Sequence, residues 1–142
     1  MTSTQLMEQI CSSTNLNQAL RRVKKNKGCA GVDKLDIAAT ISVLRQSSNG
    51  QALRQSLLDG SYQPQPVLGV EIPKPSGGVR QLGIPTVLDR IVQQAITSVL
   101  TDIYEPKFSN SSYGFRPNRS AHHALAAASH YIEGGAGLCS RC

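Results

Sequence analysis

The feature that most constrains the fold is the run of residues 87–103, in which apolar side chains recur with helical period. The apolar residues fall in successive pairs four positions apart, and polar residues, Asp89 among them, fill the other positions. This period predicts one long amphipathic helix with an apolar stripe along one face. Thr86 is a suitable N-cap, with Asp89 in the acidic position of a capping box. The apolar members are Val87, Leu88, Ile91, Val92, Ala95, Ile96, Val99, Leu100 and Ile103.

The segment before this helix predicts a β-hairpin. Residues 67–72 and 79–84 are rich in β-branched and aliphatic side chains, and Pro75-Ser76-Gly77-Gly78 lies between them. Two such runs around a glycine-containing turn are typical of a hairpin. Because proline cannot donate a backbone hydrogen bond, Pro73, Pro75 and Pro85 place this hairpin at a sheet edge.

The remaining segments predict helices and loops. Residues 4–25 read as helical with a break at 12–15, a basic glycine-containing loop covers 24–31, and residues 36–58 form a helical stretch interrupted near 47–50. A loop spans 105–117, and an alanine-rich helix runs from 118 or 119 to 132. The fold class is therefore α+β. The sheet is small, so the apolar face of the long helix is expected to need packing partners beyond this chain.

Length and charge narrow the class of protein. A chain of 142 residues favours one domain, and a net charge of +6 is the expected footprint of a nucleic-acid binder. A solvated, slightly basic surface is the alternative. No stretch approaches the roughly 18–20 apolar residues of a membrane span, and the four cysteines show no disulfide framework, which favours a cytoplasmic location. The basic residues cluster at Arg21, Arg22, Lys24, Lys25 and Lys27, the candidate RNA-binding set.

The predicted hairpin turn carries two cations. Lys74 enters the turn and Arg80 leaves it, so a tight hairpin would hold both at one end of a stiff ribbon. Such a pair suits a polyphosphate, with lysine as a point charge and arginine as a fork of donors. Flanking bases on a solvated hairpin remain the alternative.

The loop 111–120 interleaves aromatics with arginines. Tyr113 or Phe115 could stack on a base while Arg116 or Arg119 meets a phosphate. Alternatively both aromatics plug a core and Arg119 caps a helix. We favour the core interpretation for the aromatics, and both interpretations stay open for the arginines.

Four segments, in order, carry a resemblance to a known family. They are Gly28–Asp33, the Lys74–Arg80 hairpin, Leu82–Arg90 and Ser111–Ser120. Together they are similar to group II intron-encoded reverse transcriptases and maturases, proteins of mobile elements, over about residues 18–133.

The resemblance implies the fingers part of a right-hand polymerase, with residues 1–133 forming the N-terminal extension and fingers. It implies that Lys74 and Arg80 hold the triphosphate of the incoming nucleotide, and that Arg116 and Arg119 lie near the template. The implied partners are RNA, a DNA primer and deoxynucleoside triphosphates, and the full-length enzymes would use Mg²⁺.

The chain departs from the family pattern after residue 133. The family continues into a strand with the first metal-binding aspartate, whereas residues 134–142 contain no acid and predict an aberrant tail. We therefore expect no catalytic residue, no metal ligand and no polymerase activity in this fragment alone. Cys139 and Cys142 lack a second cysteine pair, which argues against a structural zinc. A standalone RNA-binding module and a non-functional remnant stay open as alternatives.

Overall fold

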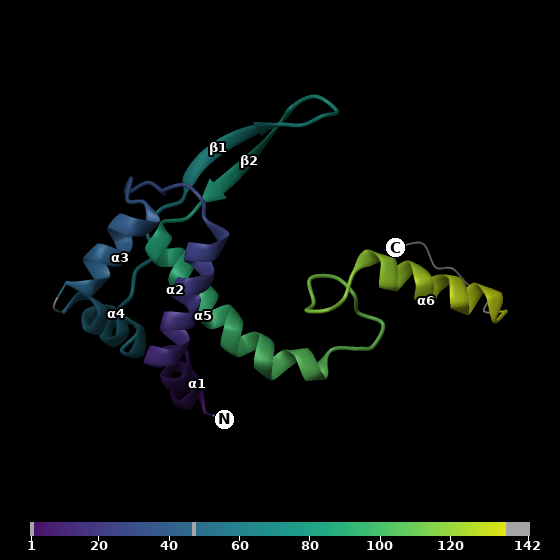
Figure 1. Ribbon diagram of the computed structural model, residues 1–142, viewed down its shortest axis with the longest axis horizontal. Coiled ribbons are helices and arrows are strands. Elements are labelled where there is room, and N and C mark those ends of the chain that lie inside the picture. Colours follow the sequence, from purple (N-terminus) through teal and green to yellow (C-terminus); the bar gives the residue numbers. More distant parts are fainter. Residues whose placement is uncertain (1, 47, 136–142) are drawn as a thin grey trace. The chain divides into compact units, whose positions relative to one another are not determined.

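The computed structural model describes residues 2–46 and 48–135. The chain divides into two compact units, Met1–Leu100 and Thr101–Cys142. The described residues form six α-helices, one short 3-10 helix and one two-stranded antiparallel hairpin, shown in Figure 1. The predicted mixed α+β class is confirmed. The assignment to the fingers of a polymerase stays a prediction.

The first two helices, α1 (Ser3–Ile10) and α2 (Ser13–Asn26), are separated at Cys11 and Ser12. The Ser12 hydroxyl accepts from the backbone N–H of Asn15 at 3.3 Å and so caps α2. The predicted break at residues 12–15 is therefore shorter than expected, because residues 13–15 already form the first turn of α2. Likewise, the loop predicted from residue 24 begins only after Asn26.

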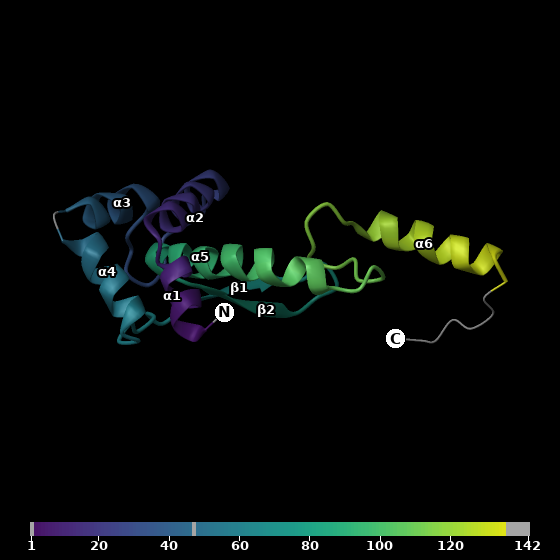
Figure 2. The same cartoon turned by 90° about the horizontal axis from the view of Figure 1, so that it is seen from below.

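The next two helices, α3 (Ile37–Arg45) and α4 (Asn49–Leu58), match the predicted interrupted stretch. The Asp36 carboxylate accepts from the N–H of Ala39 at 2.7 Å and caps α3. In the first unit α3 contacts α4, and α4 contacts α1, which in turn contacts α2; Figure 2 shows these helices from below.

The hairpin is formed by β1 (Leu68–Pro73) and β2 (Val79–Ile84), within one residue of the predicted strands. The turn is closed by the N–H of Lys74, which donates to the carbonyl of Gly78 at 2.9 Å. Gly77 and Gly78 have φ values of 90° and 80°, a conformation that favours glycine and explains their place in the turn.

The long helix α5 (Val87–Tyr104) follows β2 almost directly and forms the centre of the first unit's core. The buried apolar residues of the first unit also include Ala19 and Val23 of α2 and Leu57 of α4. The Asn15 side-chain amide donates to the Ala95 carbonyl at 3.0 Å and ties α2 to α5. The helix buries Val87, Asp89, Ile91, Val92, Ala95 and Val99.

One expectation for α5 is wrong: Asp89 was expected on the polar face, but it is only 4% exposed. The apolar face is covered in part within the first unit, where Val87 and Ala95 are 0% exposed, while Leu88 and Ile96 stay half-buried. The need for packing partners beyond this chain stays a prediction. Among the described residues no helix is both long and apolar enough to cross a membrane.

The second unit holds the end of α5, a 3-10 turn at Glu105–Lys107 and α6 (Ala121–Glu133). The predicted start of α6 at residue 118 or 119 is two to three residues early, because Asn118 has a φ of 58° and Ser120 is the N-cap. The predicted aberrant tail has only residues 134 and 135 in the described range. Its other residues, with Cys139 and Cys142, lie outside that range.

Candidate functional site

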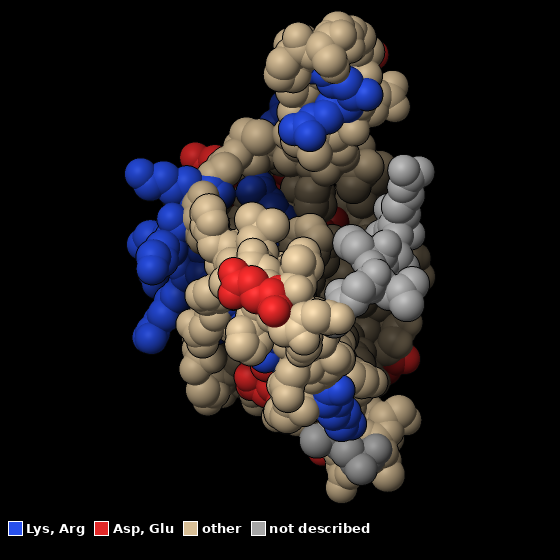
Figure 3. Space-filling view, turned by 90° about the vertical axis from the view of Figure 1, so that its right-hand side faces the viewer, with Lys and Arg blue, Asp and Glu red and all other residues tan. Residues whose placement is uncertain are grey.

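The hairpin places its two cations on one face. Arg80 pairs with Ile72 across the ladder, and Lys74 lies two positions beyond Ile72, so strand alternation puts Lys74 and Arg80 on the same side near the turn. Both side chains are exposed. Within the part of the chain that the structure describes, neither forms an ion pair. In Figure 3 the hairpin, at the top as in Figure 1, carries blue side chains.

Behind these cations the same face of the ribbon is apolar. Val70 pairs with Leu82 and Leu68 pairs with Ile84, all on the face of Arg80. Val70 and Leu82 are 36% and 45% exposed. The hairpin therefore offers two positive charges at its end and an aliphatic surface behind them, an arrangement that suits an anionic group attached to a flat apolar one.

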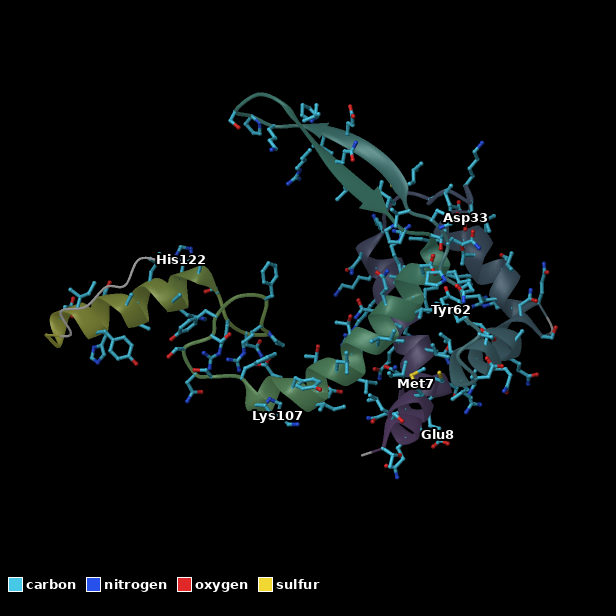
Figure 4. The ribbon with its side chains drawn as sticks, turned by 180° about the vertical axis from the view of Figure 1, so that it is seen from behind. Met7, Glu8, Asp33, Tyr62, Lys107 and His122 are labelled. Atoms are coloured by element: carbon cyan, nitrogen blue, oxygen red, sulfur yellow. The ribbon has the colours of Figure 1, made fainter. Side chains whose placement is uncertain are left out.

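The root of the hairpin is fixed by Asp89. One carboxylate oxygen accepts from the Tyr62 hydroxyl, and the other accepts from the N–H of Gln65 at 3.0 Å and from the Thr86 hydroxyl at 2.8 Å. Burial and the neighbouring Asp89 carboxylate raise the pKa of Tyr62 well above its usual range. Figure 4 shows Tyr62 beside α5.

The glycine-containing loop 28–33 lies against the start of α5. A Cβ on Gly31 would come within 2.7 Å of the Thr86 Cα and 3.0 Å of the Pro85 carbonyl carbon, so only glycine allows this approach. Arg90 donates from Nη2 to the carbonyl of Cys29. Two of the segments that carried the family resemblance, far apart in sequence, therefore pack against each other.

The basic cluster lies on and after the last two turns of α2. All five members are exposed, and Lys27 is the C-cap with a φ of 55°. Lysines in a last turn are favoured by the helix dipole. Arg22 also donates to the Ser98 hydroxyl of α5 at 3.1 Å. The cluster can follow a phosphate backbone, and its RNA-binding role stays a prediction. Its members are Arg21, Arg22, Lys24, Lys25 and Lys27.

Arg116 holds its own loop together. Its side chain is 8% exposed and forms an ion pair with Glu105 at 2.9 Å between Nη2 and Oε1. It also donates to the carbonyls of Ser109 at 2.7 Å and Ser112 at 3.0 Å, and its guanidinium lies over the Phe108 ring. A phosphate at Arg116 would have to displace these partners. Its contact with the template stays a prediction.

Arg119 and the loop aromatics are arranged differently. Arg119 donates to the carbonyl of Ser112 at 3.3 Å, and its guanidinium lies 5.2 Å from the centre of the Tyr113 ring. Tyr113 is half-buried beneath it. Phe115 is fully exposed, so the prediction that it plugs a core is wrong. An exposed ring beside arginines is available for stacking on a base.

The described side chains do not fit a Mg²⁺ site. Across residues 2–46 and 48–135, no three His, Cys, Asp or Glu side chains lie close enough together to hold a metal ion. Asp89, the buried carboxylate, has its oxygens occupied by three donors.

Asp89 and its partners are the residues that sequence reasoning missed. The capping-box position of Asp89 drew attention to it, but helical periodicity assigned it to the polar face. Tyr62 and Gln65 lie 27 and 24 residues earlier, between the predicted helical stretch 36–58 and the predicted hairpin. The one available signal was an acid inside an apolar run just after a strand.

Comparisons with known proteins agree with the family resemblance found in the sequence. A family model described as reverse transcriptase (RNA-dependent DNA polymerase) matches residues 72–136. Protein YkfC of Escherichia coli is 47% identical over 98 residues, which cover 69% of this chain and 24% of that protein. The group II intron-encoded protein LtrA of Lactococcus lactis is 44% identical over 95 residues, covering 62% of this chain and 16% of that protein.

A more distant relative extends over more of the chain. The mitochondrial nuclear intron maturase 2 of Arabidopsis thaliana is 32% identical over 135 residues, which cover 80% of this chain and 18% of that protein. The chain thus spans between 16% and 24% of the length of these three relatives.

Proposed function

We propose that this chain, which belongs to the family of group II intron reverse transcriptases and maturases, supplies the fingers-side part of an RNA-directed DNA polymerase. In this role the hairpin end holds the triphosphate of an incoming deoxynucleotide through Lys74 and Arg80. The basic cluster at the end of α2 holds the RNA strand.

The observation that carries the proposal is the register of the hairpin. It sets Lys74 and Arg80 on one face near the turn, exposed, with aliphatic side chains behind them. A triphosphate carries several negative charges at one end of a flat base and sugar. Arginine offers it a fork of donors and lysine a point charge.

RNA binding rests on a different observation. Five exposed cations lie within seven residues, and each phosphate they neutralise releases counterions. This cluster does not depend on the hairpin, so it also supports the second candidate function, an RNA-binding module without polymerase activity. The two candidates differ in whether the chain recognises a nucleoside triphosphate.

Polymerisation itself is not proposed for this chain alone. The two-metal mechanism needs carboxylates that hold Mg²⁺ beside the primer end. Lys74 and Arg80 can position a triphosphate but cannot replace such ligands.

The test is a binding titration of Arg80→Ala with a fluorescent deoxynucleoside triphosphate. Loss of one charge-assisted phosphate contact removes about 1.5–3 kcal/mol, so affinity should fall roughly ten- to a hundredfold. Arg45→Ala is the matched control, because Arg45 is an exposed arginine on α3. RNA affinity should change little in either variant. Equal triphosphate affinity for wild type and Arg80→Ala would leave the RNA-binding module as the better candidate.

A further inference from the structure

The hairpin is not held in place by packing along its length. Almost every residue of β1 and β2 is exposed, and only Ile72 and Ile84 are half-buried. Figure 1 shows the ribbon projecting beyond the helices of its unit. The direction of such a ribbon is set at its root, where the chain enters β1 and leaves β2.

Asp89 binds both sides of that root. Gln65, whose N–H donates to Asp89 Oδ2 at 3.0 Å, lies three residues before β1. Thr86, whose hydroxyl donates to the same oxygen at 2.8 Å, lies two residues after β2. One carboxylate oxygen therefore joins the entering and leaving segments. The other oxygen accepts from Tyr62, which lies upstream of Gln65.

The network is more than a helix cap. A capping residue needs one hydrogen bond to a backbone N–H in the first turn, and Thr86 already supplies it by accepting from the N–H of Asp89 at 3.2 Å. A carboxylate that is 4% exposed must keep its donors, because a buried charge without them is strongly unfavourable. The donors and the acceptor therefore fix one another's positions, and the geometry has little freedom.

A third segment, the loop 28–33, packs against the residues that follow β2. Gly31 lies against the backbone of Pro85 and Thr86 so closely that a Cβ would meet Thr86 Cα at 2.7 Å. The segment that leaves the hairpin is thus packed against the loop 28–33 and also hydrogen-bonded to Asp89.

We propose that Asp89 is a positioning residue that aims the hairpin, so that Lys74 and Arg80 reach the triphosphate. Asp89 itself does not touch the nucleotide. It acts through the roots of the ribbon, and Tyr62 is its accessory donor. The assignment of the nucleotide as the target rests on the proposed function, whereas the control of hairpin direction does not.

The experiment measures direction and binding separately. The native cysteines are first replaced by alanine. Nitroxide labels are then attached at Ser76→Cys, in the turn, and at Gln18→Cys, on α2. Pulsed electron spin resonance measures the distance between the two labels, which reports where the hairpin end lies relative to α2. In this background Asp89→Asn and Tyr62→Phe are compared with Asp102→Asn, which removes an exposed acid from the same helix. Urea unfolding of each variant reports stability, and the fluorescent triphosphate reports affinity.

We expect one narrow distance peak in the parent and in Asp102→Asn, and a broadened or displaced peak in Asp89→Asn and Tyr62→Phe. In variants that remain folded, triphosphate affinity should fall about ten- to a hundredfold, the effect of losing one charge-assisted phosphate contact. RNA affinity should not change. Asp89→Glu, which keeps the charge, should recover part of the affinity.

Two results separate the possible failures. A narrow, unshifted peak in folded Asp89→Asn or Tyr62→Phe would overturn the positioning role. If Asp89→Asn does not fold, Tyr62→Phe decides the matter, since it removes a single hydroxyl. A broadened peak in a protein whose parent binds no triphosphate would support the positioning role and overturn the proposed function instead.

Discussion

Replacement of Gly31 by alanine tests how closely the loop 28–33 packs against α5. The new Cβ would lie 2.7 Å from Thr86 Cα, 2.8 Å from Thr86 N and 3.0 Å from Pro85 C, and all three are backbone atoms. They cannot rotate away as the end of a side chain can, so the loop or the first turn of α5 must move. Extra carbons in a well-packed site typically destabilise by about 1–3 kcal/mol, and these distances argue for about 2–3 kcal/mol.

The assay is urea unfolding followed by circular dichroism. With a slope of about 2 kcal/mol per molar, the midpoint of Gly31→Ala should fall by about 1–1.5 M. Gly69→Ala is the control, because a Cβ there meets nothing within 4 Å and no left-handed φ is involved. That variant should be neutral or gain about 0.5–1 kcal/mol, since glycine weakens a strand interior relative to alanine. Equal midpoints for the two variants would refute the close packing of the loop.

Three further predictions follow from exposed and buried groups. RNA affinity should fall steeply between about 50 and 200 mM salt, with a log–log slope near −0.7 per phosphate contact on single strands, and a flat response in a filter-binding titration would argue against the basic cluster. In the folded protein, iodoacetamide should alkylate Cys29 faster than Cys11 at about pH 8, because Cys11 is buried and desolvation raises the pKa of its thiol. Peptide mapping measures the order, and faster alkylation of Cys11 would contradict the prediction. No template-dependent product should form in primer extension on an RNA template with Mg²⁺, and product from a contaminant-free sample would contradict the expected inactivity.

The sequence predicts those parts of the fold that local chemistry determines. The hairpin ends within one residue of the prediction, because the glycines at 77 and 78 adopt positive φ angles that few other residues tolerate. The long helix is confirmed because its apolar period runs unbroken through 87–103. The predicted N-cap Thr86 is confirmed for the same local reason, since its hydroxyl accepts from the backbone N–H of Asp89 at 3.2 Å, three residues on.

The parts that could not be predicted depend on contacts between distant residues. Asp89 is polar by type and lies between apolar positions, so period alone assigns it to solvent. Its burial depends on Tyr62 and Gln65, which are 27 and 24 residues away. The need for glycine at 31 depends on the position of Thr86. No pattern within either segment contains that information.

The contacts of the loop arginines could not be predicted from the sequence either, although their partners lie closer along the chain. For the arginines, the interleaved pattern favours nucleic-acid contacts and internal contacts equally, whereas for the aromatics the sequence favours internal contacts. The folded loop brings Glu105 to Arg116 and leaves Phe115 exposed. Spacing along the chain could not distinguish these outcomes, because the loop has no period to follow.

The most direct test of the central claim is a nuclear magnetic resonance titration of the labelled chain with a deoxynucleoside triphosphate. If the hairpin end is the triphosphate site, the largest shifts should occur at residues 74–80, including the guanidinium signal of Arg80, while the signals of α2 should move little. Largest shifts in α2 instead, or no shifts at the hairpin when nucleotide is in excess, would contradict the assignment of Lys74 and Arg80.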